Sequence, residues 1–333
     1  MDVFAYERPS VPAVAVSALR DDPHAVLLAG GTELVNWLKD GIVRPARVLD
    51  INGLHGLDTI EVDATCLRIG ALVRMSDLAA HTQVRRDYPA IPEALLRSAS
   101  QQLRNMASMG GNLLQRTRCP YFRAEVELPC NKRVPGSGCS ALDGEDRSMA
   151  IFGWSEQCIA THPSDVAVAF AALDAEVTLQ GPDGVRSVPV TSFYRMPLAE
   201  PERDTVKEPT ELITGITVPA SAVARRSWYL KVRERTSYEF ALVSVAAGAE
   251  LDGSGAIREA RIALGGVAHG PWRLPTAEQS LIGVRIDNRE GLRTAIEDAF
   301  SDARPRRSNG FKVELAKRAV VRTLQTAAGV AAQ

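Results

Sequence analysis

The sequence predicts an α+β protein with a small parallel βαβ lobe, a larger mixed and mainly antiparallel lobe, and a C-terminal α+β domain. Near the N-terminus a strand, a helix and a second strand follow one another closely, which favours parallel pairing through a right-handed crossover. Further along, alternating apolar segments joined by short polar turns indicate antiparallel strands. With 333 residues the chain is long enough for about two or three domains. We place them at residues 1–55, 56–219 and 222–333, with a cysteine-rich insert at about 115–160.

The first lobe is organised around residues 26–34, Val-Leu-Leu-Ala-Gly-Gly-Thr-Glu-Leu. The pattern predicts a buried strand, a turn at Gly30 and Gly31, and a helix that begins at Glu33. Adjacent glycines let the backbone approach a phosphate closely, and the amides at a helix start favour an anion. Taken alone, the pattern is more typical of a purely structural turn. The lobe also includes an expected helix over 12–19 and a strand over 47–51.

The second lobe contains another pair of glycines, Gly110 and Gly111, between Ser108 and Asn112. Two paired-glycine segments with hydroxyl or amide neighbours predict opposite walls of one phosphate-bearing cofactor site. The remaining elements expected here are strands at 57–62, 66–71, 175–180, 185–190 and 211–218, and helices at 78–81, 92–100 and 166–174.

The sequence pattern of residues 222–333 predicts a separate domain. Three segments have the alternation and β-branched content of strands, and three have the spacing of amphipathic helices. We expect a three-stranded antiparallel sheet with the helices on one face. The expected strands are 227–234, 241–251 and 257–264, and the expected helices are 276–281, 289–300 and 310–327.

Charge and hydropathy exclude several classes of protein. Lys and Arg (39) nearly balance Asp and Glu (40), so no overall field favours nucleic acid. No apolar segment approaches the ~18 residues of a membrane span, and we expect no membrane insertion. The N-terminus lacks the basic start and apolar run of a signal peptide. We therefore expect a cytoplasmic protein, or a periplasmic one exported together with a signal-bearing partner subunit. Walker and Gly-x-Ser-x-Gly motifs are missing, so kinase or hydrolase chemistry finds no support.

Four of the five cysteines lie in the insert, where signals of regular structure fade. An odd count without a signal peptide argues against disulfides and in favour of ligands or free thiols. Zinc sites usually draw on close Cys-x2–4-Cys pairs, and these are absent, so zinc is disfavoured. Spacing alone leaves an iron–sulfur cluster and all other interpretations equally open. Cys66 lies apart from these four, in an expected strand. We expect its thiol to be buried and chemically inert.

Taken in order, these motifs resemble the FAD-binding subunits of the xanthine dehydrogenase and aldehyde oxidoreductase family of molybdenum hydroxylases. The matching stretches are 29–34, 104–113, 163–165, 211–214, 230–233 and 264–273. The resemblance implies that the first two lobes together form an FAD-binding domain. By that resemblance, the residues that hold FAD are Ala29, Gly30, Gly31, Thr32, Glu33, Leu34, Ser108, Gly110, Gly111 and Asn112, with Asp165 and Lys231 as further polar contacts.

The gap from Asn112 to Pro163 is longer than in most members of that family. It is similar to the gap in a subgroup, including bacterial aldehyde oxidoreductases and hydroxybenzoyl-CoA reductases, whose flavin subunit carries an additional [4Fe-4S] cluster. The resemblance therefore implies that the insert holds such a cluster, with the ligands Cys119, Cys130, Cys139 and Cys158.

The resemblance also implies a function. The chain would be the electron-transfer subunit of a heterotrimer with a large subunit that holds the molybdenum cofactor and a small subunit that holds two [2Fe-2S] clusters. Electrons would pass from those clusters through FAD to ferredoxin, oxygen or NAD, and an insert beside the flavin tilts the choice towards ferredoxin or oxygen. No catalytic residue is assigned to this chain beyond the flavin itself. The alternatives are a self-sufficient FAD oxidase of the vanillyl-alcohol type and a zinc-stabilised interaction module.

Overall fold

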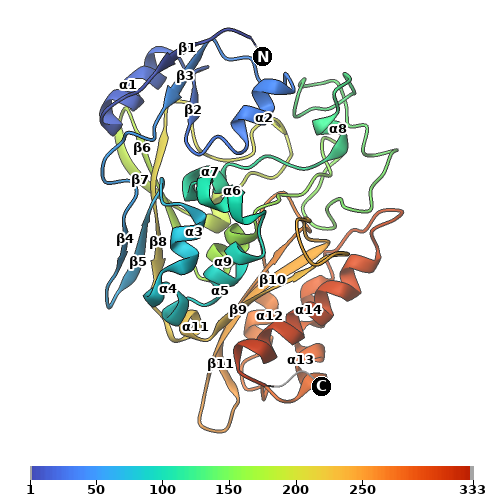
Figure 1. The fold of residues 1–333 in the computed structure, drawn as a ribbon. Coiled ribbons are helices and arrows are strands. Elements are labelled where there is room, and N and C mark those ends of the chain that lie inside the picture. The colour runs from blue at the N-terminus through green and yellow to red at the C-terminus, as the bar shows by residue number, and fades with distance from the viewer. Residues whose placement is uncertain (1, 331–333) are drawn as a thin grey trace.

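The computed structural model describes residues 2–330, and these form three sheets with helices around them (Figure 1). The predicted α+β architecture is confirmed. The small lobe at the N-terminus lies at one end of the molecule and the C-terminal helices lie at the other (Figure 1). No helix within residues 2–330 combines the length and the apolarity that crossing a membrane would require.

The small lobe is a parallel sheet with the strand order β1-β3-β2. The central strand pairs on one side with the predicted strand before the glycine turn. On its other side lies a short edge strand that the sequence did not predict, because all three of its residues are exposed and show no apolar alternation. The elements are β1 (Ala5–Glu7), α1 (Pro12–Asp21), β2 (Val26–Leu28), α2 (Leu34–Lys39) and β3 (Arg47–Asp50).

The large lobe is built on an antiparallel sheet of order β4-β5-β8-β6-β7. Its strands are β4 (Ile60–Val62), β5 (Cys66–Gly70), β6 (Glu176–Gly181), β7 (Gly184–Pro189) and β8 (Leu212–Pro219). The predicted strand over 57–62 is shorter than expected. Leu57 instead packs in an apolar cluster shared by the small and large lobes, and its carbonyl oxygen accepts a hydrogen bond from the amide of Leu72.

Helices of the large lobe pack with this sheet around one apolar core, and Phe170 and Tyr88 are among its fully buried side chains. The helices are α3 (Met75–Ala80), α4 (Thr82–Asp87), α5 (Ala90–Leu96), α6 (Gln101–Met106), α7 (Met109–Leu113), α9 (Asp165–Ala172) and α10 (Val190–Phe193). Helix α11 (Ala222–Arg225) follows at the start of the C-terminal domain. Helix α7 contains the second glycine pair and α6 precedes it, and neither helix was predicted from the sequence.

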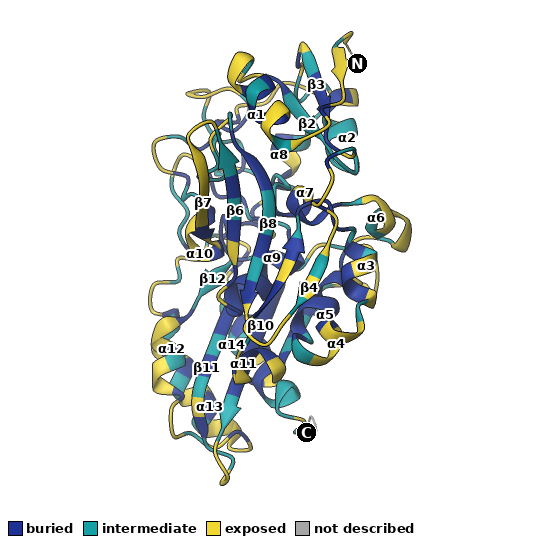
Figure 2. Ribbon diagram, turned by 90° about the vertical axis from the view of Figure 1, so that its left-hand side faces the viewer, coloured by how far each residue is buried: buried dark blue, intermediate teal, exposed yellow. Residues whose placement is uncertain are grey.

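The C-terminal sheet is antiparallel and has four strands, not the predicted three, in the order β12-β11-β10-β9. The additional strand, β12 (Trp272–Arg273), is too short to show any periodicity and pairs with Ala263 and Leu264. Most of β10 is buried (Figure 2), because α9 covers one face of the sheet and α14 the other. The other elements are β9 (Ser227–Val232), β10 (Val243–Leu251), β11 (Ile257–Gly265), α12 (Pro275–Ser280), α13 (Arg289–Ile296), a 3-10 helix (Glu297–Phe300) and α14 (Phe311–Ala327).

The insert at 115–160 has little regular structure, as its sequence predicted, apart from α8 (Pro120–Arg123). It nevertheless has a small core of its own, in which Phe122 and Met149 are buried beside the cysteines. Figure 1 shows it in green, to one side of the small lobe.

Candidate functional site

A cleft of about 580 Å³ is lined by residues of the small lobe, of the large lobe and, at Lys231 and 238–240, of the C-terminal domain. Its volume is typical of sites that hold a cofactor or another small ligand. Every residue predicted to bind the cofactor lines this cleft, except Gly110. These residues are Ala29, Gly30, Gly31, Thr32, Glu33, Leu34, Ser108, Gly111, Asn112, Asp165 and Lys231.

The first glycine pair forms the turn between β2 and α2. Gly31 has a φ of +72°, a conformation that L side chains rarely adopt. A Cβ at Gly30 would lie 1.9 Å from the carbonyl oxygen of Met106, so only glycine lets the two lobes approach here. The N-cap residue of α2 is Glu33, whose side chain makes no capping hydrogen bond. The turn therefore presents bare backbone to the cleft, as a phosphate-bearing cofactor requires.

The second glycine pair does not form a turn, because it lies within α7. The Ser108 hydroxyl caps that helix and accepts a hydrogen bond of 3.3 Å from the amide of Gly111. Gly110 faces away from the cleft lining and donates its amide to the carbonyl oxygen of Ala71, at 2.8 Å. A Cβ there would lie 3.0 Å from the Cβ of Ala71. Gly110 thus allows α7 to pack closely against Ala71, which follows β5. Ser108 and Gly111 line the cleft.

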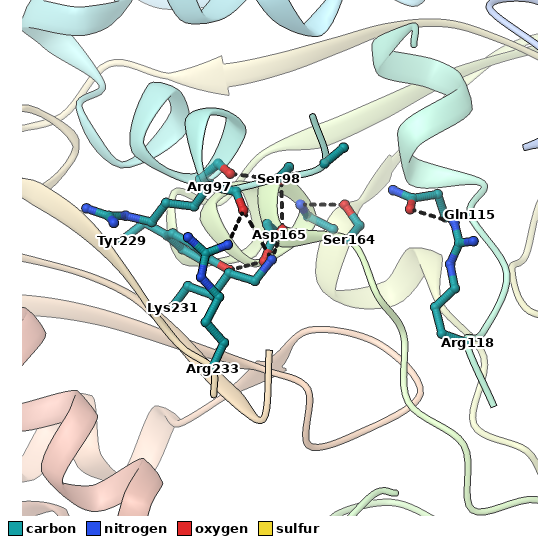
Figure 3. A network of polar contacts seen from close by, with 12 residues as sticks. Arg97, Ser98, Gln115, Arg118, Ser164, Asp165, Tyr229, Lys231 and Arg233 are labelled. Carbon is teal, nitrogen blue, oxygen red and sulfur yellow. Dashed lines mark hydrogen bonds and ion pairs between the residues drawn. The ribbon is translucent and has the colours of Figure 1, made fainter. Parts of the chain in front are cut away.

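Asp165 is the centre of a buried polar network at one wall of the cleft (Figure 3). Its carboxylate accepts hydrogen bonds from the Ser98 hydroxyl at 2.7 Å and from the Tyr229 hydroxyl. Lys231 Nζ lies 2.8 Å from the same carboxylate, and both side chains are almost fully buried. Burial, together with the nearby Asp165, raises the pKa of Tyr229, so its hydroxyl stays protonated as a donor. The two predicted polar residues are therefore each other's main partners.

Several residues that line the cleft carried no recognisable signal in the sequence. Trp37 lies on α2, and its buried Nε1 has no hydrogen-bond partner within residues 2–330. Arg118 lies in the insert, and its guanidinium stacks 5.0 Å from the centre of the Phe240 ring. The cleft residues that the sequence did not mark include Trp37, Ser98, Arg118, Thr205, Lys207, Tyr238 and Phe240.

The four cysteines of the insert line one small pocket. Cys130 and Cys139 pair across an antiparallel backbone bridge, and a hydrogen bond from Cys158 lowers the pKa of Cys139 to about 6. Burial raises the pKa of Cys119 to about 11. All four are free cysteines. The residues 2–330 contain no group of three or more His, Cys, Asp or Glu side chains placed to hold a single metal ion.

The cysteine-rich insert is fastened to the rest of the protein by ion pairs. Glu33 of the glycine turn pairs with Arg118 at 2.7 Å and also with Arg123. On the other side Asp204 pairs with Arg116 at 2.7 Å and with Lys132. Burial alone would raise the pKa of Asp204, but these two cations lower it to about 2.

The cleft and the cysteine pocket are neighbours along the chain. Arg118 lines the cleft, and the next residue, Cys119, lines the pocket. The peptide bond between Arg118 and Cys119 thus connects the two sites directly.

Comparisons with known proteins agree with this geometry. Residues 2–221 match the family model for the FAD binding domain in molybdopterin dehydrogenase, and residues 228–327 match that for the CO dehydrogenase flavoprotein C-terminal domain. The chain is 50% identical to the aldehyde oxidoreductase FAD-binding subunit PaoB of Escherichia coli K12, over 98% of this chain and 99% of PaoB. It is 28% identical to the glyceraldehyde dehydrogenase medium chain of Sulfolobus acidocaldarius, over 86% of this chain and 83% of that protein.

Among solved structures, the quinoline 2-oxidoreductase of Pseudomonas putida 86 aligns with a TM-score of 0.75 and 25% identity. The alignment covers 99% of this chain and 98% of that chain. The chain therefore belongs to the FAD-binding subunits of the molybdenum hydroxylase family, as its motifs predicted.

Proposed function

We propose that this chain binds FAD in the cleft and carries electrons from partner subunits to an external acceptor. The observation that carries the proposal is that two glycine segments, far apart in the sequence, line one cleft together. The backbone of Gly30 to Thr32 and the Ser108 hydroxyl suit the pyrophosphate, because amides and hydroxyls donate to phosphate oxygens. FAD when bound would supply one-electron and two-electron chemistry.

Asp165 and Lys231 would shape the wall of this FAD site. Each already satisfies the charge of the other, so their role is to hold the cleft in one geometry and to offer remaining hydrogen-bonding capacity to the cofactor. Asn112 acts in a similar way, because its side-chain oxygen accepts a hydrogen bond of 2.5 Å from the Ser164 hydroxyl.

The partners in this proposal are a large subunit with the molybdenum cofactor and a small subunit with two [2Fe-2S] clusters, in a heterotrimer. The relatives are named as subunits or medium chains of larger enzymes, which supports an assembly. PaoB is named as part of an aldehyde oxidoreductase, and we take an aldehyde as the substrate class of the complex. The assembled complex should oxidise aldehydes while the isolated chain does not. Turnover of a small alcohol by the isolated chain would instead support an oxidase of the vanillyl-alcohol type.

We also propose that the insert binds a [4Fe-4S] cluster through Cys119, Cys130, Cys139 and Cys158. The support is that all four thiols line one pocket, and thiolates are the usual ligands of such clusters. Lys132 also lines this pocket, where its charge acts to lower the pKa of Cys158, and it would offset part of the negative charge of the bound cluster.

The test is an anaerobic absorbance spectrum with iron, sulfide and flavin quantitation on the full chain. We expect flavin bands, a broad visible shoulder and about four irons per chain. Cys130→Ser should lose the iron and the shoulder, whereas Cys66→Ser should keep both, because Cys66 lies in β5 outside the pocket. A colourless protein with one zinc and no flavin would contradict the proposal and support the zinc module.

Ferredoxin or oxygen is the acceptor that we propose. The insert packs on the glycine turn through Glu33, and Arg118 occupies part of the cleft wall, so the insert narrows the room for a nicotinamide. Stopped-flow mixing of the reduced complex with ferredoxin, oxygen and NAD tests this, and rapid, saturable reduction of NAD would overturn it. The working compartment would be that of the partner subunits, the cytoplasm or, after joint export, the periplasm.

A further inference from the structure

Three cationic side chains line the cleft, and they differ in their partners. Arg118 is ion-paired with Glu33 and Lys231 with Asp165. Within residues 2–330 the only hydrogen bond of Lys207 Nζ goes to the carbonyl oxygen of Glu208, at 2.9 Å. Lys207 is therefore a cation of the cleft that forms no ion pair with a carboxylate of residues 2–330.

The carboxylates nearest to Lys207 are already engaged elsewhere. Glu208 accepts a hydrogen bond of 2.9 Å from Arg203, and Glu211 accepts two, of 2.6 and 2.8 Å, from Arg186. Burial lowers the pKa of Lys207 to about 8, although Glu211 and Glu208 act in the opposite direction. A partly desolvated ammonium without a counter-ion is costly, and a bound anion would remove that cost.

The backbone around Lys207 is joined to the segment that leads to Pro163. Thr205 lines the cleft and forms a backbone bridge with Tyr194, whose ring lies 4.3 Å from the ring of His162. His162 directly precedes Pro163, which also lines the cleft. The segment that carries Lys207 thus borders the cleft on the side of Pro163, without belonging to either glycine motif.

We propose that the Lys207 ammonium is a counter-ion for bound FAD. FAD is anionic at its pyrophosphate in every oxidation state and gains further negative charge on its ring when it is reduced. Either group would complete the coordination of Lys207 Nζ, which has donors to spare. The proposal rests on the FAD-binding function proposed above and adds a residue that neither glycine motif predicts.

Two variants and a control test this proposal on the full chain. Lys207→Met removes the charge, and Lys207→Arg keeps it. The control is Lys39→Met, which changes the net charge equally at an exposed residue outside the cleft lining. The measurements are the dissociation constants of FAD and of ADP, which carries a pyrophosphate but no flavin ring, and the midpoint potential of the bound flavin.

If Lys207 contacts the pyrophosphate, K207M should weaken both FAD and ADP by about ten- to hundredfold, with little change in potential. If it contacts the ring, ADP binding should stay as in the wild type and the flavin potential should fall, because the reduced form loses its counter-ion. In both cases K207R should retain most of the wild-type behaviour. If K207M matches K39M in all three measurements, the role assigned to Lys207 is wrong, and the FAD-binding function of the cleft is unaffected. A wild-type chain that binds no FAD would overturn both the assignment and the cleft function.

Discussion

Arg118 Nη2 lies 2.7 Å from Oε2 of Glu33, so a residue of the glycine turn is ion-paired to the residue next to Cys119. Arg123 binds the other oxygen of the same carboxylate. Glu33 thereby fixes the insert to the part of the small lobe that lines the cleft.

Replacing this carboxylate should loosen the insert. Glu33→Gln leaves two partly buried guanidinium groups without an anionic partner, and we expect it to cost about 1–3 kcal/mol in the free energy of unfolding. Limited proteolysis should show faster cleavage within 124–138, and urea unfolding should report the loss. Glu61→Gln is the control, because Glu61 is exposed on β4. Equal cleavage rates in both variants would show that Glu33 does not anchor the insert.

Closure of the two lobes should depend on the absence of a side chain at residue 30. Gly30→Ala would place a Cβ 1.9 Å from the Met106 carbonyl oxygen, so the backbone must shift, at a cost of about 1–3 kcal/mol or more. We expect low flavin content after purification and a lower urea midpoint. Gly253→Ala makes the same chemical change where a Cβ would meet no atom within 4 Å. Full flavin content in Gly30→Ala would contradict the proposed approach of the lobes.

Asp165 and Lys231 should stabilise the folded protein mainly through their interaction with each other. Lys231→Met leaves a buried carboxylate without its counter-charge, and we expect a loss of about 3–5 kcal/mol in the free energy of unfolding. Asp165→Asn combined with Lys231→Met should lose less than the two single losses added together, since the residues interact directly. Strict additivity in urea unfolding would mean that the pair contributes nothing as a pair.

Acid should destabilise the protein through His162. Burial lowers its pKa from 6.5 to about 3, so the folded protein keeps this ring neutral while the unfolded chain protonates it below pH 6.5. The stability is therefore present above pH 6.5 and is lost as the pH falls towards 3, at about 1.4 kcal/mol per pH unit.

The matched variant for this effect is His162→Phe, which keeps an aromatic ring against Tyr194. Urea unfolding at pH 8 and pH 5 should show a loss for the wild type that exceeds the loss for the variant by about 2 kcal/mol. Identical losses in the two proteins would assign the acid sensitivity to other groups.

The sequence predicted the residues of the cleft better than their geometry. Gly30 and Gly111 both belong to Gly-Gly pairs, yet one lies in a turn that needs glycine at its lobe contact and the other in a helix capped by Ser108. Nothing in the local sequence separates these cases, because the difference arises from which backbone packs opposite each glycine. The edge strands β1 and β12 escaped prediction for a related reason: pairing with a neighbour defines them, and periodicity does not.

The long-range ion pairs could not be predicted from the sequence either. The basic residues of the insert look like a solvated surface loop, and only the fold shows that Arg118 reaches Glu33 and that Lys132 reaches Asp204. Lys207 gave no signal either, because its significance comes from the partners that it lacks.

The hydrogen bond between Ser164 and Asn112 joins the two ends of the chain segment that contains the insert. Because the ends are held together at the cleft wall, the length between them has little effect on the wall itself, and closing a longer loop costs only slightly more entropy. The hydrogen bond thus lets the length of the insert vary while Asn112 keeps its place in the cleft wall.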